Sequence, residues 1–154
     1  MGQLKRLVIH CTATPEGREV TAEKIRRWHM DPPPAGRGWS RVGYSDLIHL
    51  DGHIERLQDY DEDHVVDNWE ITNGAAGYNS TSRHVVYAGG TRHGQPFDTR
   101  TPAQMLALKF YVERFRLFHP DAEIIGHNWL NKSKACPSFN VETWLGAIGL
   151  QNRR

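Results

Sequence analysis

Short apolar runs separated by polar stretches predict a series of buried β-strands. Three such runs lie at residues 7–9, 85–88 and 123–126. The first and the last end at a histidine, His10 and His127 respectively. Because strand ends adjoin the loops that commonly carry functional groups, these two histidines are candidates for a site.

A longer run at residues 42–50 is followed by the turn pair Asp51-Gly52 and a returning run at residues 53–57. Two β-rich segments around an Asp-Gly pair predict a β-hairpin. Residues 59–82 are mostly polar and are predicted to be irregular.

A first helix is predicted at residues 21–29, with Thr21 as its N-cap. It must end before Pro32-Pro33-Pro34, because proline cannot continue a helix. Residues 32–41 are rich in Pro and Gly and are predicted to form a loop.

A second helix begins at residues 101–104, where Thr is the N-cap, Pro takes the first helical position and Gln completes a capping box. A third is predicted at residues 141–150. Apolar residues that follow the second helix start at helical spacing are expected to face the core: Met105, Leu108, Val112, Phe115 and Phe118. Strands and helices do not alternate regularly, so the pattern predicts an α/β (α+β) fold with a central mixed sheet flanked by helices.

The length of 154 residues is typical of one domain, spanning residues 1–154. The net charge of +1, from 19 basic and 18 acidic residues, argues against a nucleic-acid partner. Neither a signal-peptide apolar region nor a run of transmembrane length is present. We therefore expect synthesis in the cytoplasm, no membrane insertion and a monomer.

Two imidazoles and one thiolate, from His10, His127 and Cys136, would form a three-ligand zinc set with a fourth position free for water. Zinc lowers the pKa of such a water to ~7 and so supplies hydroxide. Spacing alone leaves alternatives open, because nine histidines are scattered along the chain and Cys11 could pair with Cys136. The absence of a secretory signal argues against that disulfide.

Seven short motifs, in order and spanning nearly the whole chain, resemble those of one family. They are Val8-Ile9-His10-Cys11-Thr12-Ala13-Thr14, Val42-Gly43-Tyr44, Leu50-Asp51-Gly52, Gly77-Tyr78-Asn79, Gly89-Gly90, Thr101-Pro102-Ala103-Gln104 and Lys134-Ala135-Cys136-Pro137-Ser138-Phe139. The chain resembles the zinc-dependent N-acetylmuramoyl-L-alanine amidases of the phage T7 lysozyme and peptidoglycan recognition protein type.

The resemblance implies that His10, His127 and Cys136 bind Zn2+. It also implies that Tyr44 and Lys134 are catalytic and stabilise the oxyanion, with Tyr44 the favoured proton carrier. Cys11 is not a ligand in the family and is expected to be a small buried residue.

Three departures from the family pattern concern the substrate. The family often has a histidine in the loop before Gly-Tyr-Asn, whereas residues 73–76 contain none. A substrate contact is therefore either lost or supplied from elsewhere, with His64 and His84 as the candidates. Ser45-Asp46 replaces a histidine or aromatic residue that often follows the tyrosine. The proline-rich segment is an insertion expected beside the groove, as a fixed wall.

The implied activity is hydrolysis of the amide bond between N-acetylmuramic acid and L-alanine in peptidoglycan. A phage or prophage endolysin is the favoured role, which requires a holin or another route to the cell wall. A cytosolic amidase that recycles anhydromuropeptides and a non-catalytic peptidoglycan-binding module are the alternatives. The catalytic fold is expected to use the whole chain, leaving no separate cell-wall-binding domain.

Overall fold

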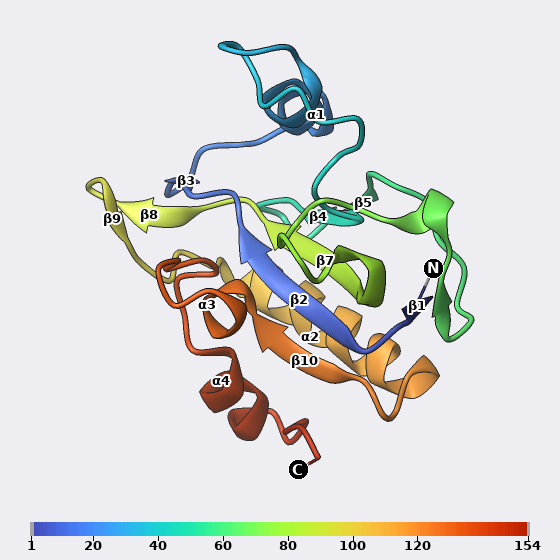
Figure 1. Cartoon of the computed structure of the whole chain (residues 1–154). Coiled ribbons are helices and arrows are strands. Elements are labelled where there is room, and N and C mark those ends of the chain that lie inside the picture. The colour runs from blue at the N-terminus through green and yellow to red at the C-terminus, as the bar shows by residue number, and fades with distance from the viewer. Residues whose placement is uncertain (1, 154) are drawn as a thin grey trace.

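The computed structural model describes residues 2–153 and is built on a five-stranded mixed sheet (Figure 1). Its strand order is β10-β2-β7-β4-β5, and all neighbours are parallel except the β4–β5 hairpin. The strands are β2 (Arg6–Cys11), β4 (Asp46–Ile48), β5 (Ile54–Arg56), β7 (Ser82–Tyr87) and β10 (Glu123–Gly126). The predicted mixed sheet and hairpin are therefore confirmed.

Two small sheets and two 3-10 helices lie around this sheet. The segments are β1 (Gly2–Gln3) paired with β6 (Val65–Val66), β3 (Thr14–Pro15) paired with β8 (Gly90–Arg92), β9 (Gln95–Pro96) paired with β8, η1 (Asn68–Glu70) and η2 (Asn79–Thr81). Residues 59–82 are thus mostly irregular, as predicted.

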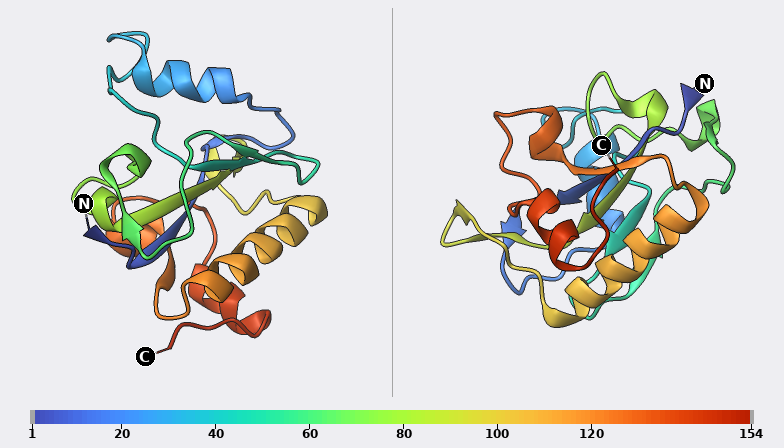
Figure 2. Two further views of the ribbon diagram at one scale, coloured as in Figure 1. Left: turned by 90° about the vertical axis from the view of Figure 1, so that its right-hand side faces the viewer. Right: turned by 90° about the horizontal axis from the view of Figure 1, so that it is seen from below.

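Helices cover both faces of the central sheet, as the views in Figures 1 and 2 show. On one face lie α2 (Pro102–Phe118) and α4 (Val141–Ala147), and on the other lies α1 (Ala22–Met30). The short α3 (His127–Leu130) follows β10 directly. Within residues 2–153, no helix is both long enough and apolar enough to cross a bilayer.

Strand alternation divides the core in two, because successive side chains point to opposite faces of a sheet. Val85 and Tyr87 pack in the core beside α2, whereas Val86 packs in the core beside α1. His84 therefore shares the face of Val86 and of α1. Because both faces are covered, the central strands read as nearly continuous apolar runs.

The start of α2 is as predicted, with Thr101 as N-cap and a capping box closed by Gln104. The predicted inward stripe is wrong at its two ends: Met105 is 40% exposed and Phe118 is 38% exposed. The buried stripe instead begins at Gln104, whose side-chain amide donates to the carbonyl of Ala88 (2.9 Å). A polar residue holds this core position because it pairs a carbonyl at the end of β7 that would otherwise be buried without a donor.

Three predicted elements are shorter in the structure. The returning strand predicted at residues 53–57 is regular only over β5. The strand predicted at residues 42–50 is regular only over β4. The Gly43 N–H donates to Nδ1 of His29 (2.9 Å) and draws the preceding segment away from the sheet. The helix predicted at residues 141–150 ends at Ala147, just before Gly149 with φ +74°.

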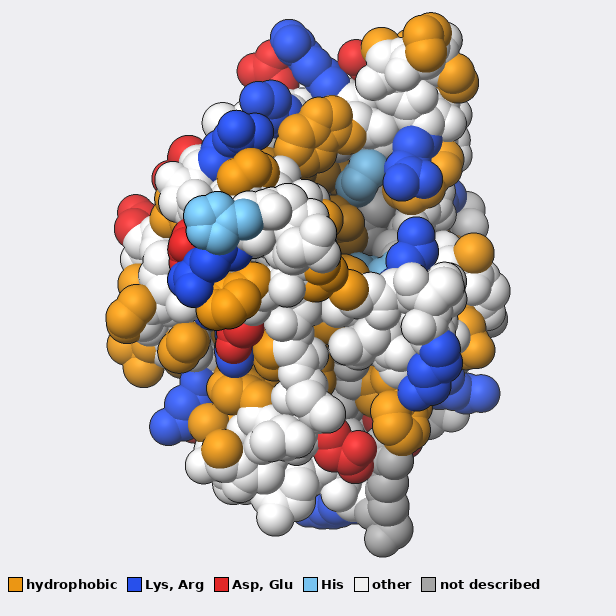
Figure 3. All heavy atoms as spheres, turned by 90° about the vertical axis from the view of Figure 1, so that its left-hand side faces the viewer, with side chains coloured by type: hydrophobic (Ala, Val, Ile, Leu, Met, Phe, Trp, Pro, Cys, Tyr) orange, Lys and Arg blue, Asp and Glu red, His pale blue; other side chains and the backbone are white. Residues whose placement is uncertain are grey.

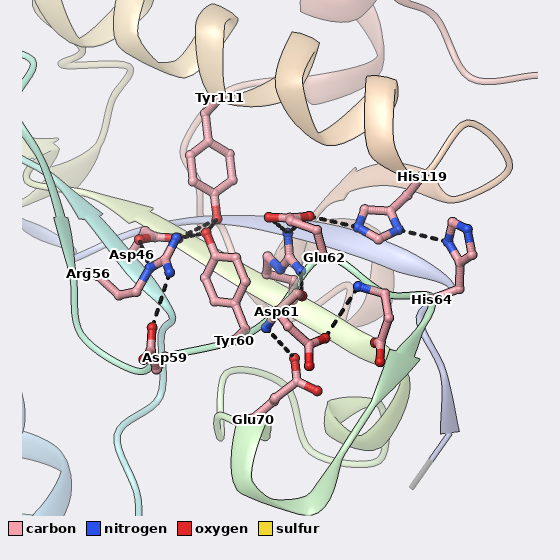
Figure 4. Close-up of polar contacts among 12 residues, drawn as sticks. Asp46, Arg56, Asp59, Tyr60, Asp61, Glu62, His64, Glu70, Tyr111 and His119 are labelled. Atoms are coloured by element: carbon pink, nitrogen blue, oxygen red, sulfur yellow. Dashed lines mark hydrogen bonds and ion pairs between the residues drawn. The ribbon is translucent and has the colours of Figure 1, made fainter.

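A buried polar network joins residues 59–64 to the sheet and to α2 (Figure 4). The carboxylate of Asp46, which is 2% exposed, accepts hydrogen bonds from the hydroxyls of Tyr60 and Tyr111 at 2.6 Å each. Burial, together with the Asp46 charge, raises the pKa of Tyr60 to about 12. Both tyrosines therefore stay protonated and donate, which satisfies the buried carboxylate.

Candidate metal site and groove

The three side chains proposed as metal ligands converge in the structure. One donor atom from each of His10, His127 and Cys136 lies within 4.8 Å of the others. Nδ1 of His10 lies 3.6 Å from Sγ of Cys136, and the two imidazole centroids are 4.7 Å apart. Among the described residues this group has the spacing and chemistry needed to hold a metal ion.

Strand pairing explains why two histidines separated by more than a hundred residues meet. The strands β2 and β10 are parallel neighbours, with Gly126 opposite Ile9, so the next residues, His10 and His127, lie side by side. Ends of adjacent parallel strands meet at one edge of a sheet, which is where α/β proteins place ligands.

Backbone contacts hold Cys136 in place. The N–H of Cys11 donates to Sγ of Cys136 (3.2 Å), and the N–H of Asn128 donates to the Cys136 carbonyl (2.8 Å). An N–H directed at the sulfur favours its thiolate form. Both cysteines carry free thiols, so the structure does not contain the alternative disulfide.

The protonation tendencies of the cluster suit metal binding. Burial, with the charges of His84 and His127, lowers the pKa of His10 well below its usual value, and burial with Lys134 lowers that of His127. Both rings are therefore neutral at neutral pH, the form that binds metals. The Cys11 side chain and burial raise the pKa of Cys136, so metal binding here would release a proton.

Tyr44 and Lys134 border the same cavity. The Tyr44 ring is half-buried and its centroid lies 5.0 Å from that of His10. Burial raises the pKa of Tyr44, so its hydroxyl remains a hydrogen-bond donor at neutral pH. The side chain of Lys134 is exposed on the loop before Cys136. Its backbone N–H donates to the carbonyl of Asn131 (3.0 Å).

A groove with a volume of about 720 Å3 lies over the cluster. Figure 3 shows it as a hollow with histidine side chains inside and Lys and Arg side chains at its rim. The proline-rich loop forms one wall through Arg37 and Trp39, as expected. Its backbone is tied to the end of α1, because the N–H of Arg37 donates to Trp28 (3.0 Å) and that of Trp39 donates to His29 (2.8 Å).

Neither histidine suggested as a substitute substrate contact faces this groove. His84 is fully buried next to His10, with 2.8 Å between His84 Nδ1 and His10 Nε2. His64 lies at the opposite end of the sheet, paired with His119 (Figure 4). The expectation of a contact from either residue is therefore wrong.

Sequence reasoning overlooked the partners of His10. The sequence offers His84 only as a possible substrate contact, and no local pattern marks Asn79, whose Oδ1 lies 3.0 Å from His84 Nε2. The available signal was strand periodicity, which places His84 on the same face as Val86. Burial lowers the pKa of His84 to about 3, so this ring is also neutral.

The Gly-Gly motif after β7 has a steric cause at Gly90. This residue has φ +108°, and a Cβ there would lie 2.4 Å from Sγ of Cys11. Only glycine tolerates both the conformation and the close approach. The motif thus lets β8 pass directly beside the cluster.

A mixed sheet that carries three potential metal ligands beside a groove, with His127 and Cys136 in the groove lining and His10 buried next to them, is the arrangement of a single-metal hydrolase. A family model described as N-acetylmuramoyl-L-alanine amidase matches residues 1–139.

The endolysin of Enterobacteria phage K11 is 34% identical over 144 residues, covering 93% of this chain and 86% of that protein. The endolysin of Escherichia phage T7 is 32% identical over 139 residues, covering 90% and 83% respectively. The structure of the amidase LysC from Clostridium intestinale URNW shares the fold, with a TM-score of 0.73, 21% identity and coverage of 97% and 88%. The chain belongs to the N-acetylmuramoyl-L-alanine amidase family.

Proposed function

We propose that the protein is a zinc-dependent amidase with the role of a phage endolysin. It would cleave the amide bond between the lactyl group of N-acetylmuramic acid and the first L-alanine of the stem peptide. The observation that carries the proposal is the convergence of His10, His127 and Cys136 beside a groove that His127 and Cys136 line, in a chain of this family. Relatives that match about nine tenths of the chain are named endolysins, which supports the bacteriolytic role.

The donor set fits zinc. Two imidazoles and a thiolate suit this ion and leave a coordination position open. Nδ1 of His10 faces Sγ of Cys136 while its Nε2 is engaged with His84, so the nitrogen directed at the cluster is available. When bound, zinc would supply a Lewis acid for the amide carbonyl and a water of pKa ~7.

We assign Tyr44 and Lys134 to the negative charge that develops on the amide oxygen. Tyr44 would donate a hydrogen bond to that oxygen through its protonated hydroxyl, and Lys134 would contribute an ammonium charge. Among the described residues that line the groove there is no Asp or Glu. We therefore assign the proton transfer to Tyr44 rather than to a carboxylic acid: its hydroxyl would give its proton to the leaving amine and regain one from the attacking water.

The charge and rigidity of the groove support polymeric peptidoglycan as the substrate. Arg37 and Lys134 make the lining cationic, which complements the carboxylates of stem peptides. The loop at residues 32–41 is bonded to α1 and acts as a wall, not as a lid. A recycling amidase would instead need to enclose a small anhydro sugar. The enzyme would act on the cell wall after release from the cytoplasm.

Digestion of purified sacculi tests the proposal, with mass analysis of the soluble products and Cys136→Ser as the inactive control. The expected products are intact stem peptides with a free N-terminal alanine, and glycan without peptide. Binding to sacculi without these products would contradict an amidase and favour a non-catalytic module. Turnover of soluble anhydromuropeptide with sacculi left intact would replace the endolysin role by recycling and keep the amidase chemistry.

A further inference from the structure

Both ring nitrogens of His10 are engaged by the fold. Nδ1 faces Cys136 at 3.6 Å, and Nε2 lies 2.8 Å from Nδ1 of His84. The register explains this contact: Val8 lies opposite His84 in the parallel pair β2–β7, so His84 is a diagonal neighbour of His10 on the same face. Both rings are at most 1% exposed, so water does not compete for this hydrogen bond.

The chain of contacts continues to a backbone donor. Nε2 of His84 lies 3.0 Å from Oδ1 of Asn79, and the same oxygen accepts a hydrogen bond from the N–H of Ala75 (2.9 Å). A backbone N–H can only donate, so the atom of Asn79 between these two groups is the oxygen. Nε2 of His84 must then carry a proton and donate it to Asn79.

The proton on Nε2 of His84 fixes the other proton positions in His84 and His10. A neutral imidazole with a proton on Nε2 has a lone pair on Nδ1, so His84 Nδ1 accepts from His10. His10 is therefore protonated on Nε2 and has its lone pair on Nδ1, facing Cys136. The reverse direction would place an N–H of the Asn79 amide against the N–H of Ala75.

We infer that His84 and Asn79 are positioning residues that hold His10 in the tautomer whose Nδ1 can bind the metal. The inference rests on the proposed zinc site. Outer hydrogen bonds of this kind orient ligand imidazoles and select the binding nitrogen. Here these outer hydrogen bonds form a relay, which begins at the N–H of Ala75 and passes through Asn79 and His84 to His10.

Gly74 gives the relay the space that it needs. A Cβ at Gly74 would lie 2.4 Å from Nδ1 and 2.5 Å from Cγ of His84. Any side chain there would press the His84 ring away from its place. The loop that lacks the histidine expected from the family thus accommodates an imidazole from β7 and supplies the terminal donor at Ala75.

The tautomer is measured directly in the metal-free wild-type protein by long-range 1H–15N correlation spectra of the imidazoles. We expect Nε2–H on both His10 and His84. A proton on Nδ1 of His10 would overturn the inference. This measurement needs neither a variant nor a bound ion, so it decides the inference even if the protein failed to bind zinc and the proposed function failed with it.

Zinc affinity, measured by competition with a chelator, tests the consequence. His84→Leu removes the acceptor, and we expect zinc binding to weaken by ~10–100-fold, the usual effect of losing such a partner. His84→Asn has the same size as the leucine variant but retains an oxygen near the place of Nδ1, so it should recover most of the affinity. Gly74→Ala should weaken binding in the same direction.

A matched control separates positioning from general destabilisation. His119 is 2% exposed and is paired with His64 and Glu62 at the other end of the sheet. His119→Leu should lower the melting temperature but leave zinc affinity unchanged. If wild-type protein binds zinc and His84→Leu binds it equally well, or if the leucine and asparagine variants are equally impaired, the inference is wrong while the zinc site stands.

Discussion

Replacing Lys134 by alanine should slow hydrolysis by ~100-fold without removing the metal. Lys134 lies on the loop that carries Cys136 and borders the groove, and its charge is already felt at His127, whose pKa it helps to lower. Its side chain is exposed. Among the described residues, it forms no hydrogen bond with His10, His127 or Cys136 that would hold the loop in place. The substitution therefore removes a charge and leaves the framework of the site in place.

The size of the effect follows from the exposure of Lys134. Two unit charges about 4 Å apart attract by ~1 kcal/mol in water and by ~4 kcal/mol at the effective dielectric constant near a protein surface. An exposed ammonium at the edge of a groove lies between these limits, at roughly 2.5 kcal/mol. Since each ~1.4 kcal/mol corresponds to a tenfold change in rate, the expected loss is about 100-fold.

The assay is turnover at saturating substrate, with the zinc content measured in parallel. Lys132→Ala is the matched control, because Lys132 is exposed on the same loop but packs over the ring of Trp129 at 4.5 Å and does not line the groove. Wild-type turnover of Lys134→Ala, or an equal loss in both variants, would refute the reasoning. A change confined to KM would show that Lys134 binds substrate carboxylates and does not stabilise the transition state.

Three further outcomes are expected. Cys136→Ser should abolish activity and lower the zinc content measured by mass spectrometry, because the thiolate ligand is lost; a fully active, metal-free variant would contradict this. Tyr44→Phe should keep the zinc but reduce turnover by ~10–100-fold through loss of one donor, and unchanged turnover would remove Tyr44 from the mechanism. His49 pairs with Glu55 (2.8 Å) and Glu19 (3.2 Å); burial opposes its charge, but these carboxylates outweigh it and raise its pKa. Its stabilisation is thus complete below the unfolded-state pKa of about 6.5 and is lost as the pH rises through the folded-state value. The melting temperature of His49→Gln should therefore fall furthest below wild type at about pH 5–6, where His49 is charged and both carboxylates are still ionised, and a gap that widens at high pH would contradict this sign.

Local patterns predicted the elements well, because their causes lie within a few residues. Examples are the capping box of α2 and the strands at His10 and His127, although β2 continues to Cys11 and β10 ends at Gly126, one residue before His127. Spacing along the chain was not enough to identify the three metal ligands. Only the family resemblance selected Cys136 from the loop that follows β10 and α3.

What the sequence did not reveal depends on contacts between distant segments. The inward position of Gln104 depends on the carbonyl of Ala88, which only the assembled sheet brings beneath the helix. The contact of His84 with His10 depends on the register of β2 against β7, which no local pattern specifies. For this reason the sequence suggested that His84, which is in fact buried against His10, contacts the substrate.

The placement of β2 has a consequence for when activity can arise. This strand lies between β7 and β10, and His10 meets Cys136 across a separation of 126 residues. A fragment of the chain without residues 127–136 would carry one ligand and lack the other two. Long-range pairing of this kind also slows folding, because a large loop must close first. Hydrolytic activity should therefore arise only once the segment that carries His127 and Cys136 has folded against β2.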